Sequence, residues 1–224
     1  MTPLIGVYLF LLGFASGLAL LAAASFRHVS PRWLQWLLTA TACLVISRYV
    51  TMALFTAPEA FRRFWPLRWL WFTGPVALTL PGVFAMDQLL QHPAMSPKTI
   101  LRWYAPFLAV YAVVLIFGVG PTAEVPEAWN TSVSPVWRMI LSTAHGIFTL
   151  AFLAACVVLV RKPLAGRARL ALLGLAAAYL YLAFDGVLLA FNGWYFRPFL
   201  FSEMVALVAI WNAFDTAASL RINR

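Results

Sequence analysis

The sequence predicts an all-α integral membrane protein, a single bundle of seven transmembrane helices. Hydrophobic residues make up 63% of the 224 residues and charged residues only 10%, whereas soluble domains have about 45–50% and about 25%. Seven stretches reach the roughly 20 apolar residues that a spanning helix needs. Because these stretches fill the chain, we predict one transmembrane domain over residues 1–224 and no soluble domain.

The predicted spans are separated by short segments rich in proline and glycine. They cover residues 4–25, 33–56, 69–91, 103–120, 136–160, 169–191 and 198–219. The first span ends in three alanines, as a cleaved signal peptide often does. However, Met1-Thr2-Pro3 carries no basic side chain and the apolar stretch is longer than a signal core, so we expect a retained helix. In the third span Pro75 and Pro81 each remove a backbone donor and predict a kink.

Two small details concern packing inside the predicted bundle. Gly13 and Gly17 form a small-xxx-small pair, which we expect to let another helix of the same bundle approach closely, with dimerisation as the alternative. Cys43 and Cys156 both fall inside apolar stretches. We therefore expect them to pack as small hydrophobic residues, without forming a disulfide or binding a metal.

The basic residues between the spans predict the orientation. One side would hold ten of them: Arg27, Arg32, Lys98, Arg102, Arg161, Lys162, Arg167, Arg169, Arg221 and Arg224. The other side would hold five: Arg62, Arg63, Arg68, Arg138 and Arg197. By the positive-inside rule the N-terminus is outside and the C-terminus is cytoplasmic in a multi-pass protein of the cell (inner) membrane. The net charge of +9 then reflects topology and the lipid bilayer as partner, so no nucleic acid is expected.

Four ionisable residues fall inside predicted spans, between the bilayer centre and the outer face: Arg48, His145, Asp185 and Glu203. Each costs a few kcal/mol at membrane depth unless it has a partner or a function. We predict a polar ligand pocket open to the outside, in which Arg48 pairs with Asp185 or Glu203 and His145 senses a proton or a ligand. The alternative is an ion pair that only holds helices together.

Two further residues are assigned to this pocket by their spacing. Ser142, His145 and Thr149 recur at i, i+3 and i+7, which places them on one face of a helix. Tyr181 lies one turn before Asp185. The predicted ligand-binding set therefore includes Ser142 and Tyr181.

Several sharper functions are excluded by missing residues. A retinal protein needs a lysine inside a helix, but Lys98 and Lys162 lie between spans. A membrane haem needs paired histidines, and only His145 lies deep in a span. No spacing fits a zinc site, a P-loop or a nucleophile elbow. We predict no cofactor, metal or catalytic residue, although acid–base chemistry on Asp185 and Glu203 stays open.

Two motifs carry a resemblance to a known kind of protein. With Phe72-Thr73-Gly74-Pro75 in the third span and Arg102-Trp103-Tyr104-Ala105-Pro106-Phe107 opening the fourth, the chain resembles bacterial seven-helix sensor regions fused to AraC-type regulators or histidine kinases. Because the sequence given ends at Arg221-Ile222-Asn223-Arg224, we expect no fused output domain. The resemblance implies a receptor-like or regulatory protein that binds a small or lipophilic ligand and signals through a separate cytoplasmic partner or another membrane subunit. A transporter, a lipid-processing membrane enzyme and a structural subunit of a membrane complex are the alternatives.

Overall fold

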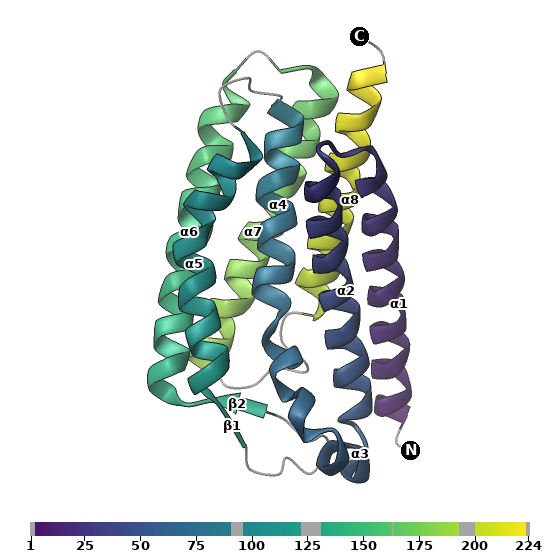
Figure 1. The fold of residues 1–224 in the computed structure, drawn as a ribbon, viewed down its shortest axis with the longest axis vertical. Coiled ribbons are helices and arrows are strands. Elements are labelled where there is room, and N and C mark those ends of the chain that lie inside the picture. Colours follow the sequence, from purple (N-terminus) through teal and green to yellow (C-terminus); the bar gives the residue numbers. More distant parts are fainter. Residues whose placement is uncertain (1–2, 91–95, 122–130, 163, 193–199, 223–224) are drawn as a thin grey trace.

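The computed structural model describes residues 3–90, 96–121, 131–162, 164–192 and 200–222, which form a bundle of helices (Figure 1). The long helices are α1 (Pro3–Ser25), α2 (Arg32–Leu54), α4 (Gly74–Leu90), α5 (Pro97–Phe117), α6 (Pro135–Val160), α7 (Gly166–Asn192) and α8 (Leu200–Ile222). Shorter helical segments are η1 (Phe26–His28), α3 (Pro58–Arg63) and η2 (Trp65–Phe72). A small antiparallel ribbon pairs β1 (Val119–Pro121) with β2 (Thr131–Val133).

Six of the described helices are long and apolar enough to cross a membrane: α1, α2, α5, α6, α7 and α8. Their outward surfaces carry large hydrophobic side chains, including Phe10, Trp36 and Trp103, which are 71%, 74% and 78% exposed. Water would be a poor solvent for such a surface, whereas lipid suits it. The prediction of a helical, multi-pass membrane protein is therefore confirmed.

The third predicted span is a bent pair of helices. The chain breaks at Thr73 between η2 and α4, whose axes differ by 41°, and the pair together is long and apolar enough for one more span. Pro75 has no N–H to donate to the carbonyl of Trp71, four residues earlier, so regular α-helix cannot continue across this point. Pro81 lies inside α4 without ending it. The expected kink therefore falls at the first of the two prolines.

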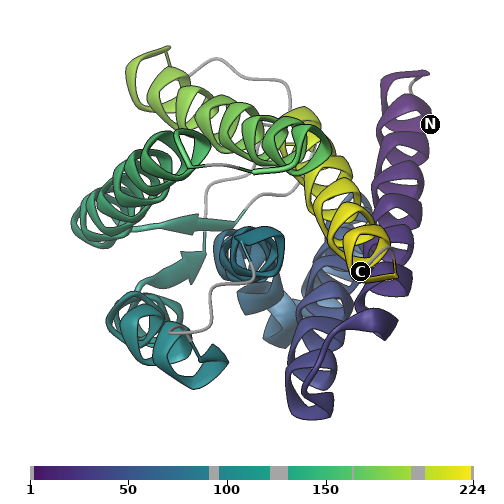
Figure 2. The same ribbon diagram turned by 90° about the horizontal axis from the view of Figure 1, so that it is seen from above.

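Helix α4 lies inside the bundle, surrounded by the other long helices, as the view from above shows (Figure 2). It contacts α2, α5, α7 and α8. Most of its side chains are accordingly buried, among them Leu78, Leu80 and Phe84. A change in the angle or position of α4 would therefore alter packing against most of the bundle.

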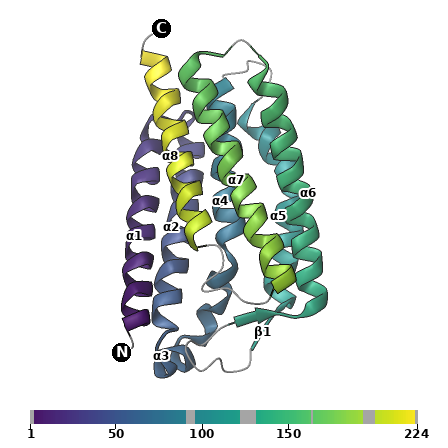
Figure 3. The same cartoon turned by 180° about the vertical axis from the view of Figure 1, so that it is seen from behind.

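Helix α1 begins and helix α8 ends at opposite ends of the bundle (Figures 1 and 3). We call the end where α1 begins the N-terminal end. The alternating directions of the helices place the last turns of α2, α5 and α7 and the first turns of α4, α6 and α8 at this end. The ribbon of β1 and β2 and the short helix α3 also lie here.

Gly13 and Gly17 do not pack against another helix in the described chain. A methyl group added at either position would meet no atom within 4 Å, so the expected close approach inside the bundle is wrong. The buried stripe of α1 runs through Tyr8, Leu12 and Ala15. Because this stripe faces the bundle, the two glycines are left on the outward side.

Candidate ligand site at the N-terminal end of the bundle

A buried ion pair joins α2 to α8. Arg48 Nη1 donates a hydrogen bond to Glu203 Oε2, and the two residues are only 6% and 3% exposed. The Tyr49 hydroxyl donates to the same carboxylate oxygen at 3.0 Å. Of the two carboxylates predicted as partners of Arg48, the structure selects Glu203. Pairing keeps either charge from being isolated in an apolar interior.

The same arginine also holds the break in the third span. Arg48 Nε donates to the carbonyl oxygen of Trp71 at 2.7 Å, which is the acceptor that Pro75 leaves without a backbone donor. Gly74 leaves room for the guanidinium, since a Cβ there would lie 3.0 Å from Arg48 Cζ. The Trp71 ring stacks on Phe55 with centroids 5.9 Å apart. Arg48 therefore connects α8 with the bend between η2 and α4.

Asp185 is bonded to the same turn of α8 that carries Glu203. It is 2% exposed, and its Oδ2 accepts a hydrogen bond from the hydroxyl of Ser202, the residue before Glu203 on α8. The first turn of α8 thus contacts one carboxylate of α7 through Ser202 and presents its own carboxylate to α2. Of the residues predicted from membrane depth, Arg48 and Glu203 are therefore in contact, and Asp185 is bonded to the residue next to Glu203.

His145 lies apart from the ion pair, against α5. Its ring centroid is 6.3 Å from that of Phe107, and its buried Nδ1 has no hydrogen-bond partner. Thr149, one turn later, is 2% exposed with a similarly unpartnered hydroxyl. Within the described residues, no hydrogen bond or ion pair joins His145 to Arg48. The predicted face of His145 and Thr149 thus points into the bundle.

Ser142 and Tyr181 are exposed at the surface of the described bundle, so their assignment to the site stays a prediction. Ser142 is exposed on α6, and the nearby Met139 is 66% exposed. Tyr181 is 37% exposed. The buried stripe of α7 runs through Leu182 and Asp185, and Tyr181 lies at its edge. Helical spacing defines a face, but the neighbouring helix decides whether that face is buried.

Tyr111 on α5 is a site residue that the sequence did not reveal. It is 2% exposed, and its hydroxyl has no partner in the described structure. It lies two turns after Tyr104, which contacts Thr79, and therefore at the level of Gly74 and Arg48. A tyrosine inside an apolar stretch resembles any other aromatic core residue, so no sequence signal distinguishes it. Tyr49 was missed for the same reason, although it follows Arg48 directly.

A second polar layer lies further along α4. The Thr79 hydroxyl is 2.6 Å from the Tyr104 hydroxyl of α5. The Tyr179 hydroxyl of α7 donates to the carbonyl oxygen of Leu78 at 2.6 Å. Gly82 makes that approach possible, because a Cβ there would lie 2.5 Å from Tyr179 Cζ. These contacts attach α4 to its neighbours through its backbone as well as its side chains.

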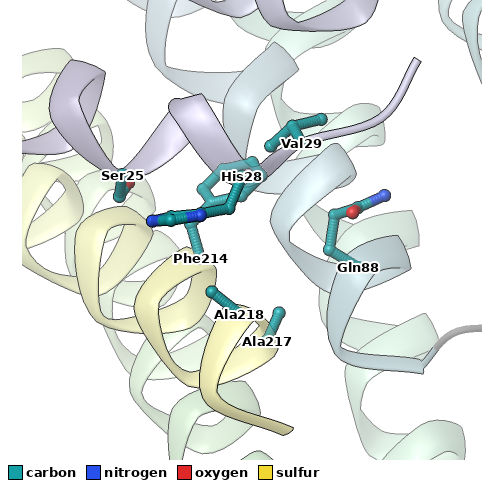
Figure 4. Close-up of a pocket in the computed structure, with 7 residues that line it drawn as sticks. All are labelled: Ser25, His28, Val29, Gln88, Phe214, Ala217 and Ala218. Carbon is teal, nitrogen blue, oxygen red and sulfur yellow. The ribbon is translucent and has the colours of Figure 1, made fainter. Parts of the chain in front are cut away.

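A small cavity lies at the other end of the bundle (Figure 4). Its volume is about 10 Å³, enough for about one water molecule. Its lining residues are Ser25, His28, Val29, Gln88, Phe214, Ala217 and Ala218. It is far too small for an organic ligand.

The chemistry of the candidate site is that of charge and hydrogen bonding. Among the described residues, no three His, Cys, Asp or Glu side chains are placed to hold a metal ion. Arg48 has a planar set of donors that suits carboxylates. The carboxylate of a ligand could therefore take the place of the Glu203 carboxylate on Arg48. Comparison of the sequence with protein-family models and with curated proteins found no match.

Proposed function

We propose that this chain is a receptor-like or regulatory protein of the cell (inner) membrane. It binds a small or lipophilic ligand in the outer half of a seven-span bundle, whose N-terminus is outside, and it signals through a separate cytoplasmic partner. One observation carries this proposal. Arg48 bonds both to Glu203 on α8 and to the Trp71 carbonyl at the bend that precedes the central helix.

A ligand that bonds to Arg48 has a direct way to change the structure. It competes with Glu203 or with the Trp71 carbonyl, and so changes what holds the 41° bend. Because α4 contacts α2, α5, α7 and α8, a shift of α4 reaches the far end of the bundle, where its last turn lies. A ligand with different affinity for two positions of α4 would shift their populations.

We expect ligand-dependent stabilisation that requires the guanidinium of Arg48. The test measures thermal unfolding of the protein in lipid nanodiscs with a panel of lipophilic acids, alcohols, amines and esters. A compound that binds raises the midpoint of the wild type by several degrees, and does not do so for the double variant Arg48→Gln/Glu203→Gln. Asp215→Asn, which changes an exposed residue of α8, should respond as the wild type does.

Other results would favour the alternatives. If no compound stabilises the wild type and the double variant remains folded, Arg48 and Glu203 are a structural pair in a membrane complex. If a compound is moved across the membrane or chemically converted, and Asp185→Asn or Glu203→Gln abolishes this, the protein is a transporter or an enzyme. Either result would contradict the receptor proposal.

We expect the two ends of the chain to lie on opposite sides of the membrane. In a Cys43→Ala/Cys156→Ala background, Thr2→Cys should react with a membrane-impermeant maleimide in intact cells. Asn223→Cys should react only after lysis, because seven spans and the positive-inside rule place it in the cytoplasm. Labelling of both ends in intact cells would contradict the odd number of spans.

A further inference from the structure

We infer that Arg48 and Tyr111 bind the carboxyl group of a lipophilic carboxylic acid. This inference rests on the proposed function and names the class of its ligand. It depends on an unsatisfied hydroxyl, on the charge balance of the site, and on the position of α5 and α6 next to lipid.

The unsatisfied hydroxyl is that of Tyr111. Buried tyrosine hydroxyls nearly always have a hydrogen-bond partner, because water is not there to replace one. Tyr111 is 2% exposed and its hydroxyl has no partner in the described part of the chain. Tyr111 lies two turns after Tyr104, whose hydroxyl is 2.6 Å from that of Thr79. Because α4 and α5 run in opposite directions, this places Tyr111 level with the Gly74 end of α4, where the guanidinium of Arg48 lies. An oxygen atom of a ligand bound to Arg48 would supply the missing acceptor.

The guanidinium of Arg48 provides the charge that a carboxylate needs. Among the described residues, Arg48 donates from Nε to Trp71 and from Nη1 to Glu203, whereas a guanidinium carries five N–H donors. A carboxylate fits this planar arrangement better than an alcohol, an ester or an amide does. An acid whose one oxygen meets Arg48 and whose other oxygen meets the Tyr111 hydroxyl satisfies both groups.

Charge balance requires the ligand to enter as a neutral acid. Arg48 and Glu203 together are neutral, and Asp185 is bonded to the turn of α8 that carries Glu203, so a free anion would add uncompensated negative charge inside the membrane. In the proposed step the O–H bond of the ligand breaks and its proton binds to Glu203. The new carboxylate then replaces that of Glu203 on Arg48, and the total charge of the site does not change.

Other titratable groups surround Glu203. They are Arg48 and Tyr49 from α2, Tyr8 from α1 next to Tyr49, Tyr111 from α5, and Asp185 from α7 through Ser202. The facing part of the bend contributes Gly74 of α4 and the backbone carbonyl of Trp71 of η2, neither of which titrates. Arg48 is the single cation of this set. It can therefore balance the charge of one carboxylate, so one bound acid requires one proton to move to Glu203.

The apolar part of the ligand follows from where Tyr111 lies. Helix α6 is the least buried candidate span, at 17% of its apolar window, and on α5 the nearby side chains of Leu108 and Val113 are 41% and 42% exposed. Phe107 packs against Tyr111 with ring centroids 6.2 Å apart. A hydrocarbon tail therefore has apolar side chains and lipid beside it, so we expect a lipophilic acid.

The test measures binding of radiolabelled decanoic acid to the full chain in nanodiscs, with empty nanodiscs as the background. Unlabelled decanoic acid should compete, whereas methyl decanoate should not. Tyr111→Phe should weaken binding about tenfold, the effect of losing a hydrogen bond to a charged group. The matched control Tyr104→Phe should leave binding unchanged, because that hydroxyl is already 2.6 Å from Thr79 Oγ1.

Variants of the ion pair test the proton exchange. Wild-type affinity should fall about tenfold for each pH unit between pH 6 and pH 8, because binding takes up one proton. Glu203→Gln should bind decanoate at least tenfold more tightly and without this pH dependence, since no carboxylate competes and no proton is needed. The neutral double variant Arg48→Gln/Glu203→Gln should not bind.

Competition by the methyl ester, unchanged binding in Tyr111→Phe, or retained binding in the double variant would each overturn the inference. If decanoic acid does not bind but a neutral compound stabilises the wild type and not the double variant, the ligand class is wrong and the proposed function stands. If neither compound acts through Arg48, both proposals are wrong.

Discussion

Replacing Arg48 with glutamine is expected to lower the free energy of unfolding by about 3–5 kcal/mol, the usual effect of removing one partner of a buried ion pair. Glu203, only 3% exposed, would be left without its cation, and the Trp71 carbonyl would lose the donor that replaces Pro75. Denaturation of the detergent-solubilised protein with SDS, followed by circular dichroism, measures the effect.

The double variant Arg48→Gln/Glu203→Gln should recover more than half of this loss, because two neutral amides leave no isolated charge and can still bond to each other. Arg161→Gln is the matched control. Arg161 is exposed at the end of α6, so this change should alter stability by less than about 0.5 kcal/mol. A loss below about 1 kcal/mol for Arg48→Gln would show that the ion pair does not hold α2, α4 and α8 together.

Replacing Gly82 with alanine is expected to destabilise the bundle by about 2–4 kcal/mol, from overpacking and the loss of one buried hydrogen bond. The new methyl group would overlap the Tyr179 hydroxyl and lie 2.5 Å from Tyr179 Cζ. Both atoms belong to the Tyr179 side chain, which is held between helices, so α7 or α4 has to move. The hydrogen bond from Tyr179 to the Leu78 carbonyl would then lengthen or break. The same unfolding assay reports the change.

Gly174→Ala is the matched control for this prediction. Gly174 lies on α7, and a methyl group there would meet nothing within 4 Å, so the change should be neutral or slightly stabilising through helix propensity. Tyr179→Leu removes the atoms that the new methyl group would overlap. In the Tyr179→Leu background, Gly82→Ala should therefore cost less stability than it does in the wild type. Equal effects of Gly82→Ala and Gly174→Ala would show that the contact of Tyr179 with α4 is not tight.

Helix positions were predictable because they depend on local composition. The fifth predicted span, 136–160, is the helix Pro135–Val160, and the second, 33–56, is Arg32–Leu54. Each segment needs enough apolar residues to cross hydrocarbon, whatever its neighbours are. The bend near Pro75 was predictable for the same local reason, since proline removes a donor. That Arg48 occupies the freed Trp71 carbonyl depends on a residue 23 positions away.

The candidate site was predictable in part. The cost of a charge at membrane depth identified Arg48, Asp185 and Glu203, because that cost applies to each residue separately. The pairing of Arg48 with Glu203 rather than Asp185 depends on how α8 is rotated between α2 and α7. Tyr111 was not predictable, because many tyrosines lie in apolar cores with a hydrogen-bonded hydroxyl and the sequence does not distinguish this one from them. The exposure of Ser142 was not predictable, because helical spacing does not tell which side of α6 faces the other helices.

The sequence by itself determined that the chain forms helices apolar enough for lipid, and it predicted a similar membrane depth for the charged residues inside them. Both follow from the free energy of transferring single segments and single side chains into lipid. Only the tertiary structure decided which side of each helix faces another helix. In lipid, apolar faces gain little from turning inward, so close packing and hydrogen bonds between helices set those rotations. These contacts join residues far apart in the chain, as the bond between Arg48 and Glu203 does.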